Sequence, residues 1–262
     1  MAYNSAFTNG IPRVLMKDYQ APQDLLQDRV ILVTGAGQGI GRTAALTFAA
    51  HGATVILHGR EVKKLEQVYD EIEAAGHPQP AIFPLDFLKA GEPDHKAFAE
   101  AIHSQLGRLD GILHNAAYLT TLTQLENETL DLWTKSLRAN LAAPFALTKA
   151  CLPLLKASPD ASVIMTSDHH ASHPAAYWGV FAVAKSGLET LVKIWAQEWE
   201  MLPQLRINAV EPGPVQSPQR LRTHPGEVHE NLPPDTSLMP TYLYLMGTDG
   251  RGVSGQVFEL GN

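Results

Sequence analysis

A run of closely spaced glycines between residues 34 and 41 has the composition of a phosphate-binding turn. The run consists of Thr34, Gly35, Ala36, Gly37, Gln38, Gly39, Ile40 and Gly41. Glycine lets the backbone turn tightly and approach a pyrophosphate with no Cβ in the way. A helix that starts there presents unpaired N–H groups and the positive end of its dipole to the phosphates. Because a strand-like run precedes the glycines and a helix-like run follows them, the segment predicts nucleotide binding.

The residues after the next strand-like run indicate which nucleotide binds. That run ends His58-Gly59-Arg60, where NAD-binding proteins usually carry an acid that hydrogen-bonds the ribose 2′-hydroxyl. Arg60 could pair with a 2′-phosphate through charge-assisted hydrogen bonds, or it could be a surface residue that starts a charged helix. We favour the first alternative and expect NADP(H) rather than NAD(H).

Three further segments, together with the glycine turn, resemble the short-chain dehydrogenases/reductases over most of residues 29–260. The turn has the form Thr-Gly-x-x-x-Gly-x-Gly, and His114-Asn115-Ala116-Ala117 is similar to the family's Asn-Asn-Ala-Gly. Asn140 lies where the family keeps a catalytic Asn in a helix, and Pro212-Gly213 matches its Pro-Gly turn beside the nicotinamide. The resemblance implies hydride transfer between a nicotinamide and a carbonyl or alcohol. It also implies that Asp86 lies beside the adenine and that Asn115 holds the cofactor-binding turn.

The sequence departs from this resemblance at the family's catalytic pair. The family has a Tyr-x-x-x-Lys motif, in which the Tyr exchanges a proton and the Lys binds the nicotinamide ribose, and an earlier Ser that hydrogen-bonds the substrate oxygen. Lys185 matches the motif, but Phe181 stands at the Tyr position and Asp168 at the Ser position. Phenylalanine has no ionisable proton, and an ionised Asp168 would oppose a developing oxyanion. We expect a retained cofactor site, in which Lys185 holds the ribose and Asn140 helps to hold a proton-relay water, beside a degraded catalytic site.

Neighbouring side chains are candidates to replace the missing Tyr, and we expect none of them to do so. Tyr177 lies one turn before Phe181 if the helix includes residue 177, an offset of about 5–6 Å along the axis, so a structural aromatic is the favoured interpretation. Ser167 neighbours Asp168, but adjacent side chains at a strand end point apart. Asp168 itself would be a weak base, because a nearby Lys185 lowers its pKa.

The histidines of the loop 168–178 and the single cysteine give little indication of a metal site or a nucleophile. His169, His170 and His173 fall where this fold places a loop over the substrate, but a histidine run alone is weak evidence for a metal site. We expect no metal site and interpret them as loop residues that could shape the pocket or make it sensitive to pH. Cys151 lies in an apolar stretch and is interpreted as a small buried hydrophobe.

The remaining pattern predicts the scaffold that positions these residues. Strand-like runs cover 29–34, 53–57, 81–83, 111–113, 162–165, 206–210 and 255–259, and helix-like runs cover 39–51, 61–75, 94–106, 127–157, 181–200 and 237–246. This alternation predicts a parallel sheet covered on both faces. Together with the resemblance, it predicts the α/β class: a single Rossmann-like, doubly wound parallel sheet with helices on both faces.

Domain organisation follows from the same pattern. Residues 1–28 are polar and turn-rich, which predicts an N-terminal arm draped over the domain or over a neighbouring subunit. Residues 29–262 are expected to form one dinucleotide-binding and catalytic domain. Residues 211–237 are dense in proline, which predicts a long, mobile excursion that lines the substrate pocket together with the loop 168–178.

The amino-acid composition and the net charge limit the kinds of partner that the protein is expected to bind. The chain has 262 residues, of which 45% are hydrophobic and 18% charged, so general disorder is excluded. The net charge of −7 provides no broad cationic surface for nucleic acid. No apolar run could cross a bilayer or form a signal peptide, so we expect no membrane partner and a cytoplasmic location. The family commonly pairs its long helices, which implies a homo-oligomer, a dimer or tetramer.

Two functions remain open from the sequence. The first is an NADP(H)-dependent oxidoreductase that acts on a small-molecule carbonyl or alcohol and uses an atypical proton donor or substrate-assisted protonation. The second is a non-catalytic relative that binds nucleotide and acts as a sensor, scaffold or subunit partner. The family resemblance favours the first function, and the residues at positions 168 and 181 favour the second.

Overall fold

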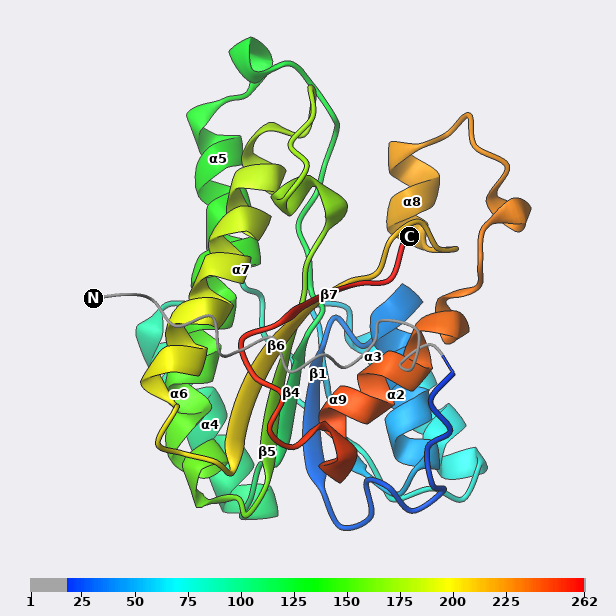
Figure 1. Ribbon diagram of the computed structural model, residues 1–262, viewed down its shortest axis with the longest axis vertical. Helices are drawn as coiled ribbons and strands as arrows, with labels where there is room; N and C mark the ends of the chain where they lie inside the picture. Colours follow the sequence, from blue (N-terminus) through cyan, green and yellow to red (C-terminus); the bar gives the residue numbers. More distant parts are fainter. Residues whose placement is uncertain (1–17, 262) are drawn as a thin grey trace.

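The computed structural model describes residues 18–261, and one parallel sheet runs through them (Figure 1). Its strand order is β3-β2-β1-β4-β5-β6-β7. The strands are β1 (Val30–Thr34), β2 (Thr54–His58), β3 (Ala81–Ile82), β4 (Gly111–His114), β5 (Ala161–Thr166), β6 (Leu205–Glu211) and β7 (Val257–Glu259). All neighbouring pairs are parallel. The structure therefore confirms the predicted α/β class.

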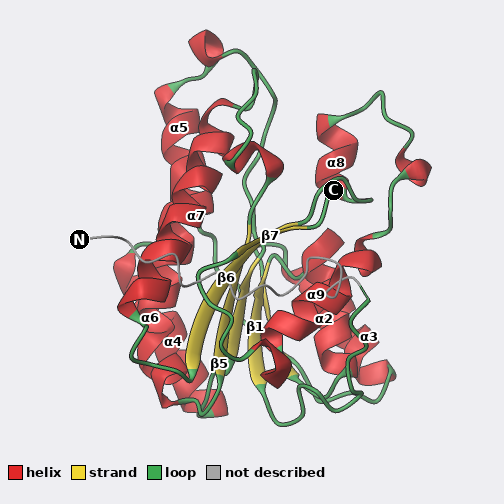
Figure 2. Ribbon diagram, viewed as in Figure 1, coloured by secondary structure: helices red, strands yellow, loops and turns green. Residues whose placement is uncertain are grey.

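Helices cover both faces of the sheet, which Figure 2 shows enclosed between two helical layers. One layer contains α2 (Gly39–Ala50), α3 (Val62–Ala74) and α9 (Met239–Met246), and the other contains α4 (Glu92–Leu106), α6 (Ala143–Ala157) and α7 (Gly179–Glu198). Successive side chains of a strand point to opposite faces. Accordingly, Ile31 and Val33 of β1 pack into the first layer, and Val30 and Leu32 pack into the second. Burial on both faces is why these strands are continuous apolar runs.

The predicted helix 127–157 is divided in the structure. A 3₁₀ turn (Leu125–Asn127) leads to α5 (Leu130–Leu137), and a π-helical turn (Arg138–Ala142) joins α5 to α6. The π turn contains Asn140, and such turns often occur at functional sites. The apolar period of the sequence does not reveal this turn, because a single inserted residue leaves the flanking helical pattern intact.

The structure shows where α7 begins and how the segment 211–237 is built. Helix α7 begins at Gly179, so Tyr177 precedes it, is exposed, has a positive φ of 75°, and does not share the helical face of Phe181. The segment 211–237, predicted as a long excursion, contains α8 (Pro218–Thr223) and 3₁₀ turns at His229–Asn231 and Asp235–Leu238. Figure 1 shows α8 beyond the carboxyl ends of the strands, opposite α5 and α7.

The described part of the predicted arm packs on the domain. Tyr19 donates a hydrogen bond to Asp249 at 2.8 Å, and its ring meets Tyr244 edge-on. Leu26 is fully buried against the α2 side of the core. Residues 1–17, the rest of the predicted arm, lie outside the described residues. Within 18–261, no helix combines the length and apolarity needed to span a membrane.

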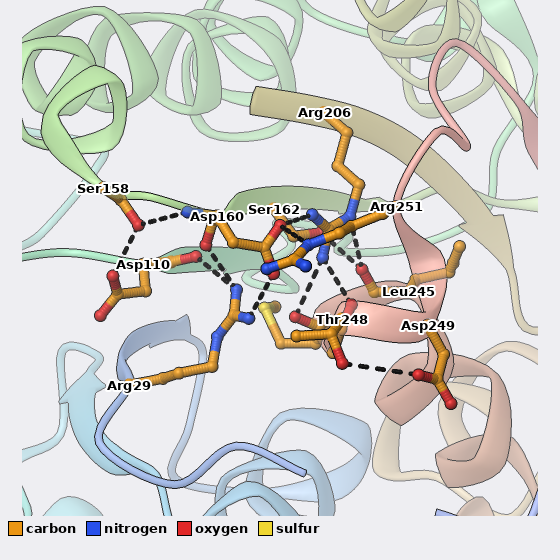
Figure 3. Close-up of polar contacts among 12 residues, drawn as sticks. Arg29, Asp110, Ser158, Asp160, Ser162, Arg206, Leu245, Thr248, Asp249 and Arg251 are labelled. Carbon is orange, nitrogen blue, oxygen red and sulfur yellow. Dashed lines mark hydrogen bonds and ion pairs between the residues drawn. The ribbon is translucent and has the colours of Figure 1, made fainter. Parts of the chain in front are cut away.

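A buried ionic cluster joins the amino ends of the strands, at the end of the sheet opposite the nucleotide turn (Figure 3). The Asp160 carboxylate pairs with Arg29, at 2.7 Å, and with Arg206. Arg29 also donates to the backbone carbonyls of Asp160 and Asp110. Burial raises the pKa of Asp160, but Arg206 and Arg29 outweigh it and hold that pKa below its usual value. The cluster therefore links the starts of β1, β4, β5 and β6.

Candidate active site

A cavity of about 610 Å³ opens at the carboxyl ends of the strands. It is bounded by the glycine turn after β1, the segments after β2, β4, β5 and β6, and residues of α7 and α8. The order in which strands are added to the sheet changes side between β1 and β4, since β2 and β3 lie on one side of β1 and β4 to β7 lie on the other. In open α/β sheets ligands bind in the crevice at this position.

The glycine turn has a backbone shape that larger residues would disturb. Gly35 has a φ of 70°, and a Cβ there would lie 2.9 Å from Cα of Ala116. A Cβ on Gly41 would lie 2.3 Å from the carbonyl oxygen of Gly35 and 2.6 Å from Nδ2 of Asn115. Gln38 is the N-cap of α2 and makes no side-chain cap. The first N–H groups of α2 therefore have no side-chain acceptor at the cap, which fits a pyrophosphate.

Thr34 and Asn115 join the glycine turn to the segment after β4. The Thr34 hydroxyl accepts hydrogen bonds from the backbone N–H groups of Asn115 and Ala116, both at 3.0 Å. The Asn115 side chain packs against Gly41, as the short Cβ distance shows. Thr34 and Gly41 do not line the cavity themselves and lie behind its wall.

One end of the cavity carries two cations. Arg60 is exposed and makes no hydrogen bond or ion pair with another residue of the described chain, and Lys64 donates to Gln38 and Glu61, both at 3.0 Å. Asp86 lines the same end, where it accepts a hydrogen bond from the backbone N–H of Leu88. Lys64 was not among the residues singled out in the sequence. The sequence feature that could have indicated Lys64 is its place in the first turn of α3, four residues after Arg60.

The other end of the cavity is built on Lys185 and Phe181. Lys185 is buried, and its Nζ donates to the carbonyl of Thr166 at 2.6 Å and lies 5.6 Å from the centre of the Phe181 ring. Burial lowers the pKa of Lys185 to about 8, although the charges of Asp168 and Glu189 oppose this shift. Phe181 is buried against Trp178.

Most of the site residues predicted from the sequence line this cavity. They are Gly35, Gly37, Gln38, Gly39, Ile40, Arg60, Asp86, Asn115, Asp168, Phe181, Lys185, Pro212 and Gly213. Asn140 does not line it. The Asn140 amide accepts from the Tyr118 backbone N–H and donates to the Tyr118 carbonyl, both at 2.8 Å. Its side chain therefore anchors the cavity wall at Tyr118, and it is not brought to the open space.

The loop after β5 contributes two histidine–carboxylate pairs to the cavity. His170 contacts Asp168 at 2.7 Å, and His169 contacts Glu211 at 3.0 Å. His173 stacks on His169 and does not line the cavity. Within residues 18–261, no group of three or more potential ligands could hold a metal ion. Sequence reasoning did not find these pairs. Only the Asp168–His170 pair had a sequence feature that could have indicated it, which is that the two residues are two positions apart.

Comparison with known proteins shows the family to which this chain belongs. The model of the short chain dehydrogenase family matches residues 29–227, about three quarters of the chain. The chain belongs to the short-chain dehydrogenase family. Its fold is therefore that of a short-chain oxidoreductase.

Individual relatives cover nearly the whole chain. The uncharacterized oxidoreductase YciK of Escherichia coli K12 is 39% identical over 241 residues, which cover 92% of this chain and 95% of that protein. Two solved short chain dehydrogenases, one from Shigella flexneri 2a complexed with NADP and one from Escherichia coli CFT073 complexed with NADPH, are each 39% identical, with a TM-score of 0.88. Each alignment covers 91% of this chain and 99% of the other.

Proposed function

We propose that this short-chain dehydrogenase is an NADP(H)-dependent oxidoreductase that interconverts a carbonyl and an alcohol. One observation carries the proposal: a single cavity connects the glycine turn and Arg60 at one end with Lys185 at the other. The two solved relatives bound to NADP and NADPH support the choice of cofactor. When bound, this cofactor supplies or accepts the hydride. The chain binds and orients it and moves the accompanying proton.

Each side of the cavity has a role in holding the dinucleotide. Gly35, Gly37, Gln38, Gly39 and Ile40 surround the pyrophosphate, and Thr34, Gly41 and Asn115 keep that turn in shape. Arg60 binds the 2′-phosphate, and Asp86 lies beside the adenine. Lys185 binds the nicotinamide ribose, while Pro212 and Gly213 lie beside the nicotinamide. Gly213 packs tightly, since a Cβ there would lie 2.3 Å from Cα of Gly261.

Replacing Arg60 by alanine is expected to weaken NADPH far more than NADH. Arg60 has no ion-pair partner among the described residues, so its charge is available to a 2′-phosphate. A hydrogen bond to a charged group contributes about 1.5–3 kcal/mol, which corresponds to a roughly ten- to hundredfold change in affinity. Calorimetric titration of Arg60→Ala with both nucleotides measures this. Equal losses of affinity for the two nucleotides would contradict the assignment of Arg60 to the 2′-phosphate. Lys63→Ala, on the neighbouring helix, is the control.

Replacing Lys185 by methionine is expected to weaken NADPH and NADH by similar factors, at least severalfold. Methionine keeps the length and burial of the side chain but cannot donate to ribose hydroxyls. Because both nucleotides share that ribose, the loss does not depend on the 2′-phosphate. Fluorescence titrations of both reduced nucleotides measure it, with a melting curve as the folding control. Unchanged affinities in a folded variant would show that Lys185 serves only its hydrogen bond to Thr166.

The catalytic end departs from the family pattern, and this departure is part of the proposal. Phe181 occupies the position of the family's Tyr, and Asp168 occupies that of its Ser. The support for this assignment is the Lys185 position four residues after Phe181 and the fact that all three line one cavity end. The proton must then come from a group other than a tyrosine at position 181.

The second candidate function is nucleotide binding without catalysis, in a sensor, scaffold or subunit partner. The observation that favours it is the buried Phe181, which offers no proton. A turnover screen over aldehydes, ketones and alcohols, run on protein shown to bind NADPH, separates the two candidates. Turnover of any member supports the oxidoreductase, and tight binding without turnover supports the second function.

We also infer that the chain forms a homo-oligomer through its long helices. Several apolar side chains of α6 and α7 are exposed in the single chain: Phe145, Val183 and Ile194. Grouped exposed apolar side chains on a monomer commonly mark interfaces. Light scattering of the purified protein tests this inference, and a monomer at micromolar concentration would contradict it.

A further inference from the structure

The short turn after β5 holds a histidine in a single orientation. Asp168 is the N-cap of the 3₁₀ turn His169–Ala171, and its Oδ1 accepts a hydrogen bond from the backbone N–H of His170 at 3.0 Å. The same oxygen lies 2.7 Å from Nδ1 of His170. An ionised carboxylate can only accept, so Nδ1 of His170 carries a proton and donates a hydrogen bond to Oδ1 of Asp168.

The imidazole of His170 is fixed on its flat side as well. It stacks on the buried Trp178 indole, with ring centres 3.7 Å apart and planes inclined by 13°. The His170 side chain is only 16% exposed. With Nδ1 on Asp168 and one ring face on Trp178, Nε2 is the polar atom left over, and no residue of the described chain hydrogen-bonds it.

The Asp168–His170 pair belongs to the catalytic end of the cavity. Both residues line it together with Phe181 and Lys185. Trp178, which supports His170, also contacts Phe181, with ring centres 6.0 Å apart. Asp168 is near enough to Lys185 for its charge to act on the pKa of that lysine. The pair therefore stands beside the residue that occupies the tyrosine position.

We propose that His170, oriented by Asp168, is the proton donor and acceptor of this enzyme in place of the tyrosine. The inference rests on the oxidoreductase function proposed above. In reduction, the hydride joins the carbonyl carbon, the C=O π electron pair moves onto the oxygen, and that oxygen takes the proton from Nε2 of the His170 imidazolium. The ring is left neutral. Its Nδ1 proton stays on the ring, hydrogen-bonded to Asp168, and Nε2 regains its proton from solvent. In alcohol oxidation, neutral Nε2 takes the hydroxyl proton.

The pairing changes the electrostatic role of Asp168. From the sequence, its negative charge was expected to oppose the oxyanion. In the structure, Oδ1 is turned to the ring and backbone of His170. A protonated His170 and an ionised Asp168 together are neutral, and the positive member is the one that can meet the substrate oxygen. A carboxylate behind a histidine also stabilises the imidazolium and fixes its tautomer. Asp168 is thus a positioning residue, and His170 is the catalytic residue.

Two neighbouring side chains are weaker candidates for the same role. His169 is held by Glu211 in a similar way, but its side chain is 48% exposed and stacks on His173 rather than on the Trp178–Phe181 wall. Tyr118 lines the cavity, but from the β4 side. Both serve as comparison variants.

The expected pH dependence depends on all charged groups around His170. They are Asp168 and His169 on its own turn, Glu211 at the end of β6, Lys185 on α7, and His224 and Arg220 at α8. The negative charge nearest to the ring is that of Asp168. Reduction uses the protonated ring of His170 and oxidation uses the neutral ring, so the two rates should change in opposite directions with pH.

The test measures NADPH-dependent reduction of benzaldehyde, diacetyl and phenanthrenequinone by the full chain. His170→Gln is expected to lower kcat by about 10²–10⁴-fold and to leave NADPH affinity within threefold. Asp168→Asn is expected to lower kcat, because His170 loses the carboxylate that fixes its ring, while Asp168→Glu recovers part of the rate. His173→Gln, a histidine of the same loop outside the cavity, is expected to match the parent protein.

Several outcomes would overturn the proposal. An unchanged kcat in folded His170→Gln would exclude His170, and a loss confined to Tyr118→Phe or His169→Gln would assign the proton to that residue. If NADPH binds and no carbonyl is reduced, the oxidoreductase function itself fails. A further readout needs no turnover: ¹⁵N-histidine NMR should show neutral His170 protonated on Nδ1 in the parent protein. A neutral ring protonated on Nε2 would contradict the pairing on which the proposal depends.

Discussion

Phe181→Tyr is expected to raise kcat for carbonyl reduction by about 10²–10⁴-fold when it is introduced into Asp168→Ser, which is the size of a general acid's contribution. Asp168→Ser alone should be nearly inactive, because it releases His170 and leaves Phe181 without a proton. The double variant would contain the family's own combination of Tyr, Lys and Ser. Lys185 already lies 5.6 Å from the centre of the ring that would carry the hydroxyl.

The two substitutions should therefore be strongly non-additive. Residues of one hydrogen-bonded group show large interaction energies in double-mutant cycles. The decisive control adds His170→Gln to the double variant, where it should have little further effect because the proton no longer passes through His170. Steady-state kinetics with the same three carbonyl compounds measure all variants. A double variant no faster than Asp168→Ser, although folded and able to bind NADPH, would contradict the assignment of positions 168 and 181.

Asp160→Asn is expected to destabilise the protein by about 3–5 kcal/mol, the usual cost of breaking a buried ion pair from one side. Two buried guanidinium groups, those of Arg29 and Arg206, would lose their shared carboxylate. For a chain of this size about 1 kcal/mol shifts Tm by roughly 2–4 °C, so Tm should fall by about 6–20 °C. Differential scanning calorimetry measures it. Asp131→Asn, in an exposed pair with Lys135, is the control and should leave Tm almost unchanged.

The pH dependence of the same pair of proteins provides a second test. The pKa of Asp160 is lower in the folded state than in the unfolded chain, because Arg206 and Arg29 outweigh the effect of burial. The stability that it contributes is present above the unfolded pKa of about 3.9 and is lost as pH falls through the folded value. The difference in Tm between the parent protein and Asp160→Asn should therefore shrink below about pH 4. A difference that is constant with pH would mean that the Asp160 charge does not contribute.

Apolar periodicity and the glycine turn predicted the sheet, the helical layers and the place of the nucleotide turn. These features depend on short-range patterns, because a strand buried on both faces must be apolar throughout and a tight turn needs glycine. The π turn at Asn140 and the short helix α8 were missed. They depend on contacts distant in sequence, such as that between the Asn140 amide and the Tyr118 backbone.

The sequence predicted the site residues that belong to backbone motifs. It did not predict which side chains pair with one another. Gly35, Asn115 and Lys185 could be named from motif spacing, and the structure places them in or against one cavity. The pairing of Asp168 with His170 could not, because two residues that follow a strand point in directions set by the turn they enter. The sequence suggested a misplaced negative charge, whereas the structure shows a carboxylate that is hydrogen-bonded to a histidine.

Calorimetric titration of the full chain with NADPH and with NADH is the most direct test of the central claim, which is that this short-chain dehydrogenase retains a working site for NADP(H). We expect one NADPH per chain, bound more tightly than NADH. At a hundredfold excess over Kd, NADPH should add about 2.7 kcal/mol to the free energy of unfolding, seen as a rise in Tm. Binding of neither nucleotide, or tighter binding of NADH, would contradict it.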